Sequence, residues 1–243
     1  MTSPIPGSNG QLHLLFIRHG ETQDNIDRVL QGHRDTSLTP KGHSEAEILA
    51  EKLQGQQIDA IYHSPLTRML QTIAPLLAAQ PSVPTHASTD LRSQALGSLE
   101  GGSYDSIDMG NPRSADGQPG VEPFDDFVRR LKRIFGRIVG TEAPLVSSSS
   151  SGNRIVVIAT HGVGITSLFK ALEATPDCQG FNPQLAVRGQ EAWEVRWTDS
   201  DDVAELVVLE PSSLPIREGV LEWERIQGRP FVIERWGKKE KAI

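Results

Sequence analysis

The stretch that decides the fold is Leu14-Leu15-Phe16-Ile17-Arg18-His19-Gly20-Glu21-Thr22, in which an apolar run is followed at once by charged residues. A short apolar run is typical of a strand buried on both faces, as in a parallel sheet covered by helices. Ligands of such sheets bind just beyond the carboxyl ends of the strands. Arg18 and His19 fall at that edge, where Gly20 lets the backbone turn. The stretch therefore predicts an α/β fold with a site at the end of this strand.

A second histidine occupies the same kind of position late in the chain. Residues 154–160 are the strongest strand candidate, and His161 and Gly162 follow directly. A helix is expected from about residue 165 to residue 173. The amide groups at its N-terminus can hold an anion, so we expect His161 to lie beside an anion-binding turn.

An arginine follows a third strand candidate, residues 58–62. Ser64 and Pro65 are typical of the start of a helix, which is expected to end before Pro81. Arg68 falls in the first turn of that helix. A lone arginine in such a position is more often a solvated residue of the helix surface.

Other segments complete the α/β pattern. Thr39 and Pro40 open a further helix, and residues 124–139 show helical periodicity. A short strand is expected within residues 81–90. Residues 193–197 and 203–209 are expected to form an antiparallel pair of strands, joined by a turn at 198–202.

Composition limits the class of protein. The chain has 243 residues, of which 37% are hydrophobic and 23% charged, which fits a soluble globular protein with a sizeable core. A net charge of -7 argues against nucleic acid as a partner, because phosphate backbones bind basic surfaces. No apolar stretch approaches the ~20 residues of a membrane span. We therefore expect neither a nucleic-acid nor a membrane partner.

The chain is expected to form one domain over residues 1–243. The polar residues 1–11 are expected to be a flexible tail without the core of a signal peptide. Residues 103–122 are expected to form a long substrate or lid loop, and residues 147–152 a low-complexity surface loop. Cys178 is the only cysteine, so no disulfide within the chain is expected, which fits a reducing, cytoplasmic location.

The expected strand ends carry side chains suited to a phosphoryl group. Neighbouring parallel strands end at one crevice, so Arg18, His19, Arg68 and His161 are expected to converge there. Arginine matches phosphate oxygens in a fork geometry, and a helix N-terminus adds amide donors. A neutral imidazole in this cradle can attack phosphorus, and two arginines can stabilise the developing charge without a metal.

Four blocks, in this order, resemble the signature of the histidine phosphatase superfamily, the phosphoglycerate mutase-like proteins. The blocks are Arg18-His19-Gly20-Glu21-Thr22 with Asn25; Gln31-Gly32 with Asp35 and Leu38-Thr39-Pro40-Lys41-Gly42; Ser64-Pro65-Leu66-Thr67-Arg68 with Gln71-Thr72; and Thr160-His161-Gly162. The resemblance covers residues 14 to about 170. It implies a three-layer α/β/α sandwich with a mostly parallel sheet, and a phosphohydrolase that needs no cofactor.

The resemblance also implies roles for single residues. His19 would be the nucleophile that becomes phosphohistidine. Arg18, Arg68 and His161 would bind the phosphoryl group, and Asn25 would assist. The positions expected to touch the substrate are Asn25, Gln31, Gly32, Ser93 and Gly162, whereas Asp35 and Gly42 are expected to serve loop and helix geometry.

One position departs from the family pattern. The family usually has L-x-E-x-x-x-G, whose glutamate protonates the leaving oxygen, and residues 91–97 match it with Ser93 in place of the acid. A serine hydroxyl does not act as a general acid near neutral pH, although such assistance contributes roughly 10²–10⁴-fold.

Three explanations of Ser93 stay open. Another carboxylate substitutes, with Glu100, Asp105 and Asp108 the nearest in the sequence. Alternatively, the leaving group needs little protonation, as in an aryl phosphate, an acyl phosphate or a diphosphate. In the third explanation the chain keeps the anion pocket as a binding module, is a weak catalyst, or performs other chemistry on a phosphate-free small molecule.

Two rival patterns are weaker. Residues 161–167 resemble part of a dinucleotide fingerprint, but its third glycine and its acidic residue are missing. His19 and His161 are also conceivable metal ligands. The sequence, however, has no tight cluster of His and Asp residues that would complete such a metal site. The sequence therefore predicts metal-independent hydrolysis of a small phosphorylated molecule. The identity of that molecule stays open, as does the formation of a homodimer.

Overall fold

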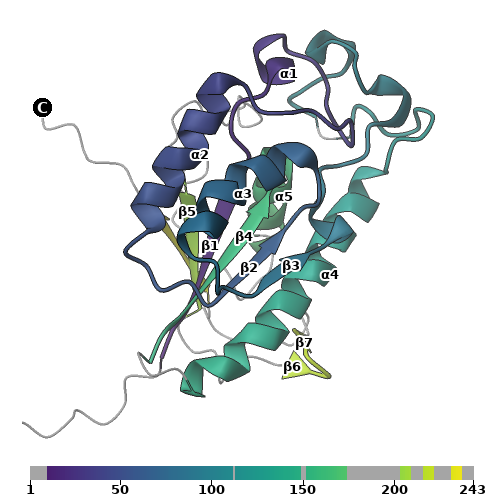
Figure 1. Ribbon diagram of the computed structural model, residues 1–243. Coiled ribbons are helices and arrows are strands. Elements are labelled where there is room, and N and C mark those ends of the chain that lie inside the picture. The colour runs from purple at the N-terminus through teal and green to yellow at the C-terminus, as the bar shows by residue number, and fades with distance from the viewer. Residues whose placement is uncertain are drawn as a thin grey trace, which may run out of the picture.

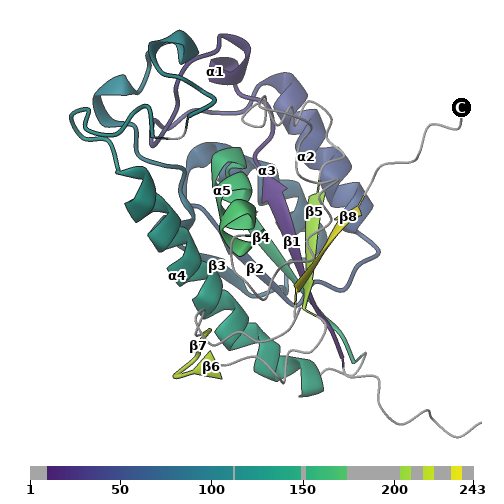
Figure 2. The same ribbon diagram turned by 180° about the vertical axis from the view of Figure 1, so that it is seen from behind.

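The computed structural model describes residues 10–111, 113–148, 152–173, 203–208, 216–221 and 231–236. Within these residues a six-stranded sheet has the strand order β3-β2-β4-β1-β5-β8 (Figures 1 and 2). Its strands are β1 (Leu12–Arg18), β2 (Ala60–His63), β3 (Thr85–Ala87), β4 (Arg154–Thr160), β5 (Val203–Val208) and β8 (Phe231–Trp236). Strand β5 is antiparallel to both of its neighbours, and the other pairs are parallel. The predicted α/β fold with a mostly parallel sheet is confirmed.

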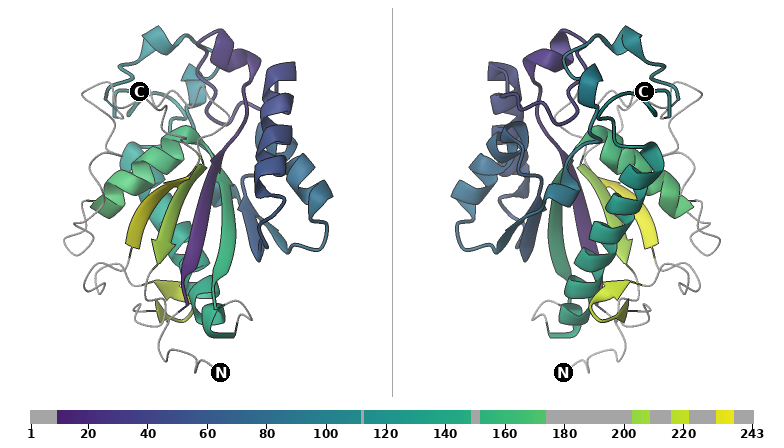
Figure 3. Two further views of the ribbon diagram at one scale, coloured as in Figure 1. Left: turned by 90° about the vertical axis from the view of Figure 1, so that its left-hand side faces the viewer. Right: turned by 90° about the vertical axis from the view of Figure 1, so that its right-hand side faces the viewer.

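Helices cover both faces of the sheet, as the side views in Figure 3 show. One face carries α2 (Pro40–Leu53) and α3 (Thr67–Ala79), and the other carries α4 (Phe124–Glu142) and α5 (Gly162–Glu173). Residues of β1 alternate between these layers, because successive side chains of a strand point to opposite faces. Leu14 and Phe16 pack with α4 and α5, whereas Leu15 and Ile17 pack with α2 and α3. None of the helices described is long and apolar enough to cross a bilayer.

Shorter elements complete the described part. The four-residue helix α1 (Gln23–Ile26) lies beyond the carboxyl end of β1 (Figure 1). Tight 3₁₀ turns span Thr89–Leu91, Gly97–Leu99, Tyr104–Ser106 and Ala143–Ser148. A small hairpin of β6 (Ile216–Arg217) and β7 (Val220–Leu221) packs against α4.

Helix α3 begins at Thr67, and not at the predicted Ser64 and Pro65. Its cap comes from a distant loop, since the carboxylate of Asp35 accepts hydrogen bonds from the amide and the hydroxyl of Thr67, both at 2.8 Å. Gly42 packs against the backbone of Glu21, where a Cβ would lie 2.2 Å from the carbonyl oxygen. Asp35 and Gly42 thus serve loop and helix geometry, as expected.

Several predicted boundaries differ from the observed ones. Helix α5 begins at Gly162, earlier than the expected residue 165, and α4 continues to Glu142. The carbonyl of Gln11 accepts the amide of Arg154 at 2.9 Å, so the predicted tail 1–11 is tied to the sheet at its last residue. Strand β5, within the predicted strand 203–209, pairs with β1 on one edge and with β8 on the other. Residues 193–197, residues 149–151 and Cys178 lie outside the described residues.

Candidate active site

The two histidines lie side by side because β1 and β4 are neighbouring parallel strands. Arg18 pairs with Thr160 at the end of the ladder, so each strand delivers a histidine at its next position. The ring centroids of His19 and His161 are 5.3 Å apart, and their planes are tilted by 56°. Both imidazoles are buried. Residues separated widely in the sequence therefore share one site at the edge of the sheet.

The surroundings of His19 determine its protonation state. Its Nδ1 atom lies 2.9 Å from the carbonyl oxygen of Gly20. A carbonyl oxygen only accepts hydrogen bonds, so Nδ1 carries the ring proton. Burial, followed by the charges of Arg18 and Arg68, holds the pKa of His19 well below its ordinary value. At neutral pH the ring is therefore uncharged, with its lone pair on Nε2.

His161 is held by a residue that follows the neighbouring strand β2. Its Nε2 atom lies 3.0 Å from the hydroxyl oxygen of Ser64. Burial, with the charges of Arg68, His19 and Arg18, keeps the pKa of His161 well below its ordinary value. Its Nδ1 atom has no hydrogen-bond partner within the described residues, so this nitrogen keeps its hydrogen-bonding capacity for a ligand.

Arg68 is only 1% exposed and is oriented by backbone carbonyls of a neighbouring loop. Its terminal nitrogens donate to the carbonyl oxygens of Arg34 at 2.8 Å and Gly32 at 2.9 Å. Burial lowers the pKa of Arg68 to about 10, which leaves the guanidinium charged at neutral pH. Burial also lowers the pKa of Arg18. The sheet edge thus combines two neutral imidazoles with two guanidinium groups.

A cavity of about 590 Å³ lies over these side chains. Small-molecule sites typically have volumes of about 300–1,000 Å³. The cavity is lined by the four side chains expected at the phosphoryl group, Arg18, His19, Arg68 and His161. It is also lined by all five positions expected to touch the substrate, namely Asn25, Gln31, Gly32, Ser93 and Gly162.

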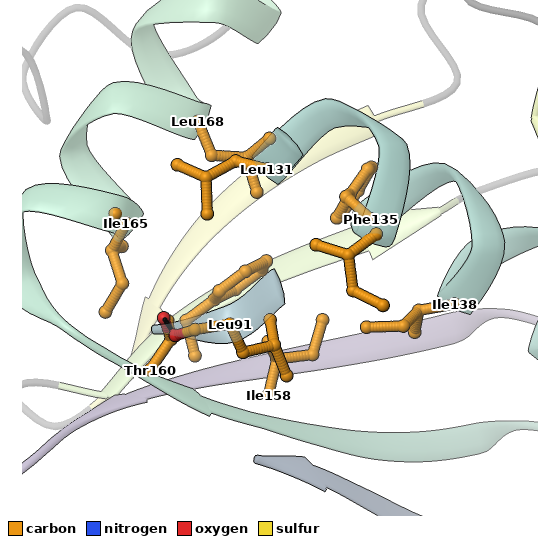
Figure 4. A pocket seen from close by; sticks show the side chains of 11 residues that line it. Leu91, Leu131, Phe135, Ile138, Ile158, Thr160, Ile165 and Leu168 are labelled. Carbon is orange, nitrogen blue, oxygen red and sulfur yellow. Dashed lines mark hydrogen bonds between the residues drawn. The ribbon is translucent and has the colours of Figure 1, made fainter. Parts of the chain in front are cut away.

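A second hollow, of about 10 Å³, lies in the apolar core between the sheet, α4 and α5 (Figure 4). It is too small and too apolar to be a ligand site. Its one polar neighbour is informative, because the hydroxyl of Thr160 donates to the carbonyl of Leu91 at 2.7 Å. This bond joins the strand that delivers His161 to the segment that carries Ser93.

The segment around Ser93 is fixed in place by hydrogen bonds to its backbone. The carbonyl of Ser93 accepts from Nε2 of His33 at 2.8 Å and from the guanidinium of Arg130 at 3.1 Å. Arg130 is itself held by an ion pair with Glu122 at 2.7 Å. Ser93 therefore reaches the cavity from a braced segment. Among the described residues, no group of three or more His, Cys, Asp or Glu side chains could hold a metal ion.

Comparison with known proteins identifies the family. The family model of the histidine phosphatase superfamily (branch 1) matches residues 14–203. The chain belongs to the histidine phosphatase superfamily. It is accordingly a phosphohydrolase of the histidine phosphatase type.

Named relatives of this histidine phosphatase include other phosphatases. A broad-specificity phosphatase of Saccharomyces cerevisiae is 30% identical over 184 residues, which cover 71% of this chain and 77% of that protein. A glucosyl-3-phosphoglycerate phosphatase of Mycobacterium tuberculosis is 30% identical over 188 residues, covering 74% of this chain and 82% of that protein. The solved structure of a phosphoglycerate mutase from Bacillus anthracis has the same fold, with a TM-score of 0.67 and 20% identity over 95% of each chain.

The three candidate substitute acids of this histidine phosphatase lie in different surroundings. One carboxylate oxygen of Glu100 accepts the amides of His33 at 2.8 Å and Leu96 at 3.0 Å, so it braces the loops. Neither Glu100 nor the exposed Asp105 lines the cavity, and the structure does not favour them as proton donors. Asp108 does line it, with one carboxylate oxygen 2.8 Å from the amide of Gly110.

Sequence reasoning missed several residues that line the cavity. Lys41 lies between two carboxylates, 3.1 Å from Glu21 and 3.6 Å from Glu45, and all three line the cavity. The cavity is also lined by Ile26, Arg28 and Gln94, which were not anticipated. Tyr104, Ile107 and Met109 line it from the predicted substrate loop, residues 103–122. Glu21 had a signal, its place beside the Arg18-His19 pair. Lys41 and Glu45 lie on α2 and Ile26 lies on α1. Arg28 and Gln94 lie on loops, which have no periodic pattern to reveal which side chains face inward.

Proposed function

We propose that this enzyme hydrolyses small phosphate monoesters or diphosphates through a phosphohistidine on His19. The observation that carries the proposal is the state of that ring. Its proton is on Nδ1, directed at the carbonyl of Gly20, and its pKa is lowered. Nε2 therefore offers a lone pair inside a cavity that Arg18 and Arg68 also line.

The proposed reaction has two displacements. Nε2 of His19 attacks phosphorus while the bond from phosphorus to the leaving oxygen breaks, and the electron pair stays on that oxygen. Water then attacks the phosphohistidine, which releases inorganic phosphate and restores the neutral ring. Arg18 and Arg68 stabilise the charge that develops on the phosphoryl oxygens in both steps. His161 binds the same oxygens in this proposal, which its unpartnered Nδ1 atom supports.

Ser93 favours substrates whose leaving group departs as a stable anion. It lines the cavity at the position where the family usually has a proton-donating glutamate. Aryl phosphates, acyl phosphates and diphosphates meet this requirement, because their leaving oxygens need little protonation. The same observation supports a second candidate function, a binding module that keeps the anion pocket with little catalysis.

The experiment that separates these candidates is trapping of the phosphoenzyme. The protein is mixed with p-nitrophenyl phosphate, quenched in base and analysed by mass spectrometry for acid-labile phosphohistidine. We expect the phosphoryl group on His19, and its loss in His19→Gln together with a fall in turnover of at least about a thousandfold. The matched control is His43→Gln, because His43 is exposed on α2 and does not line the cavity.

A phosphoryl group on another residue, or unchanged turnover in His19→Gln, would contradict the proposed mechanism. Binding of p-nitrophenyl phosphate without turnover would favour the binding module. The proposed reaction uses no metal, so treatment with EDTA is expected to leave turnover unchanged. Inhibition by EDTA would overturn that part of the proposal.

A further inference from the structure

Part of the cavity lining is mostly apolar or aromatic, with one arginine among its side chains. We call this part the ring wall and define it by Ile26, Arg28, Tyr104, Ile107 and Met109, all of which line the cavity. Ile26 is 54% exposed and Met109 is 36% exposed, and both line the same cavity. Two such residues facing one cavity indicate a surface that an apolar ligand would cover.

The ring wall is built before any ligand binds, because its two loops are joined by backbone hydrogen bonds. The amide of Tyr104 donates to the carbonyl of Arg28 at 2.9 Å. Leu30 donates to Gly102 and accepts from Gly101, both at 2.8 Å. The guanidinium carbon of Arg28 also lies 5.5 Å from the centroid of the Tyr104 ring. These contacts fix the orientation of the tyrosine ring, which lowers the entropy lost on binding.

The backbone of Arg28 supports this interpretation. Its φ angle is 55°, in the left-handed region that residues with a side chain seldom adopt. Strain of this kind persists where the surrounding structure requires it, and it gathers at functional sites. Here it coincides with the residue whose carbonyl and side chain both hold Tyr104.

The ring wall lines the same cavity as the side chains expected to bind the phosphoryl group, which are Arg18, His19, Arg68 and His161. Burial lowers the pKa of Arg18, and the nearby Tyr104 and Glu45 oppose that shift. Tyr104 is therefore an electrostatic neighbour of an arginine expected to hold the phosphoryl oxygens.

The polar side chains around the cavity are oriented by the protein itself. The amide nitrogen of Gln94 donates to the carbonyl of Glu122 at 2.8 Å, and the hydroxyl of Ser114 donates to the carbonyl of Asp108 at 2.9 Å. The side-chain oxygen of Asn111 accepts the amide of Arg113 at 3.0 Å.

We propose that the ring wall binds a flat apolar ring attached to the transferred phosphate through its ester oxygen, which makes aryl phosphates the preferred substrate class. This inference rests on the proposed function and deepens it. In the reaction the bond from phosphorus to the aryl oxygen breaks, and that oxygen leaves with the electron pair as an aryl oxide. Such an anion needs no proton from the position of Ser93. The ring wall and the absent acid thus favour the same substrates for independent reasons.

The test compares ligands that differ in ring size. Phenylphosphonate and 2-naphthylphosphonate cannot be hydrolysed, so calorimetry measures their binding without catalysis. We expect the naphthyl compound to bind about five- to tenfold more tightly, from the additional apolar area that it buries. The same ratio is expected in kcat/KM for 2-naphthyl phosphate over phenyl phosphate, whose leaving groups have similar acidity.

Variants assign the preference to the ring wall. Ile26→Ser and Met109→Ser are expected to bring the naphthyl-to-phenyl ratio close to one, as is Tyr104→Ala, whereas Tyr104→Phe keeps the ring and the ratio. The matched control is Ile48→Ser, because Ile48 is a similarly exposed isoleucine, at 39%, that does not line the cavity.

Equal binding of the two phosphonates by the unmodified enzyme would overturn the inference, even if a variant fails to fold. An unchanged ratio in folded Ile26→Ser and Met109→Ser would overturn it as well. Both outcomes leave the phosphohistidine on His19 untouched. Conversely, a naphthyl preference without any phosphoenzyme would support ring binding by the ring wall and would contradict the proposed hydrolytic mechanism.

Discussion

The carboxylate of Asp35 caps helix α3 by accepting both the amide and the hydroxyl of Thr67, each at 2.8 Å. Arg68 is the next residue, and its guanidinium donates to the carbonyls of Arg34 and Gly32, in the segment that leads into Asp35. One loop therefore sets both the start of the helix and the direction of its buried arginine. The cap and the arginine are expected to act together.

Removing the cap should affect both stability and turnover. Asp35→Ala is expected to lower the free energy of unfolding by about 1–2 kcal/mol, since the helix loses its N-terminal acceptor. It should also lower kcat/KM by loosening Arg68. Asp35→Asn keeps one acceptor oxygen and should lose less on both counts. Urea unfolding measures the stability of each variant, and steady-state kinetics measure its kcat/KM. Full activity of Asp35→Ala would show that the helix cap does not control the position of Arg68.

Arg68→Lys tests the fork geometry of the buried arginine. A lysine keeps the charge but cannot donate to both carbonyls and to a phosphoryl oxygen from one plane. We expect kcat/KM to fall by roughly a hundredfold or more. The comparison variant is Arg137→Lys, because Arg137 is exposed on α4 and does not line the cavity. Equal losses in the two variants would show that the geometry of Arg68 is unimportant.

The buried histidines should make stability fall in weak acid. The pKa values of His19 and His161 are lowered in the folded state, chiefly by burial, whereas unfolded histidines titrate near pH 6.5. Below about pH 6.5 the unfolded chain therefore binds more protons, and the free energy of unfolding falls by up to about 1.4 kcal/mol per pH unit for each ring. Urea unfolding between about pH 6.5 and pH 5 measures the slope, and His161→Gln should make it shallower. Identical slopes would mean that the ring is protonated when folded.

Ser93→Glu should restore a proton donor to the leaving group. We expect turnover of a simple alkyl phosphate to rise by about a hundredfold, the lower range of general acid assistance, with a smaller change for p-nitrophenyl phosphate. Ser93→Gln is the matched control, because it adds the same bulk without an acid. If the glutamate and glutamine variants behave alike, the side chain at this position does not face the leaving oxygen.

Asp108→Asn tests the substitute acid that lines the cavity. If Asp108 protonates leaving groups, the change should lower alkyl phosphate turnover by about a hundredfold and leave aryl turnover nearly unchanged. Asp105→Asn is the control, because the exposed Asp105 does not line the cavity. A small and equal effect of both variants would show that Asp108 does not protonate the leaving group.

The sequence by itself determined the elements that carry the site. Buried apolar runs followed by Arg18-His19 and by His161 predicted two strands of a parallel sheet, because strand periodicity and the end of burial are local properties. The helix-start signal of Ser64 and Pro65 also placed Arg68 in the first turn of its helix. These features depend on residues close in sequence, so they could be recognised without coordinates.

Only the tertiary structure decided which segments that are distant in the sequence contact one another. The cap on Thr67 comes from Asp35, a residue of another loop, so the predicted helix start at Ser64 was too early. Glu100 was a candidate acid by sequence distance, yet its carboxylate accepts backbone amides of His33 and Leu96. The ring wall joins Arg28 and Tyr104 from two irregular loops. Loops lack a repeating geometry, so their side-chain directions depend on packing and on backbone hydrogen bonds that form only in the folded chain.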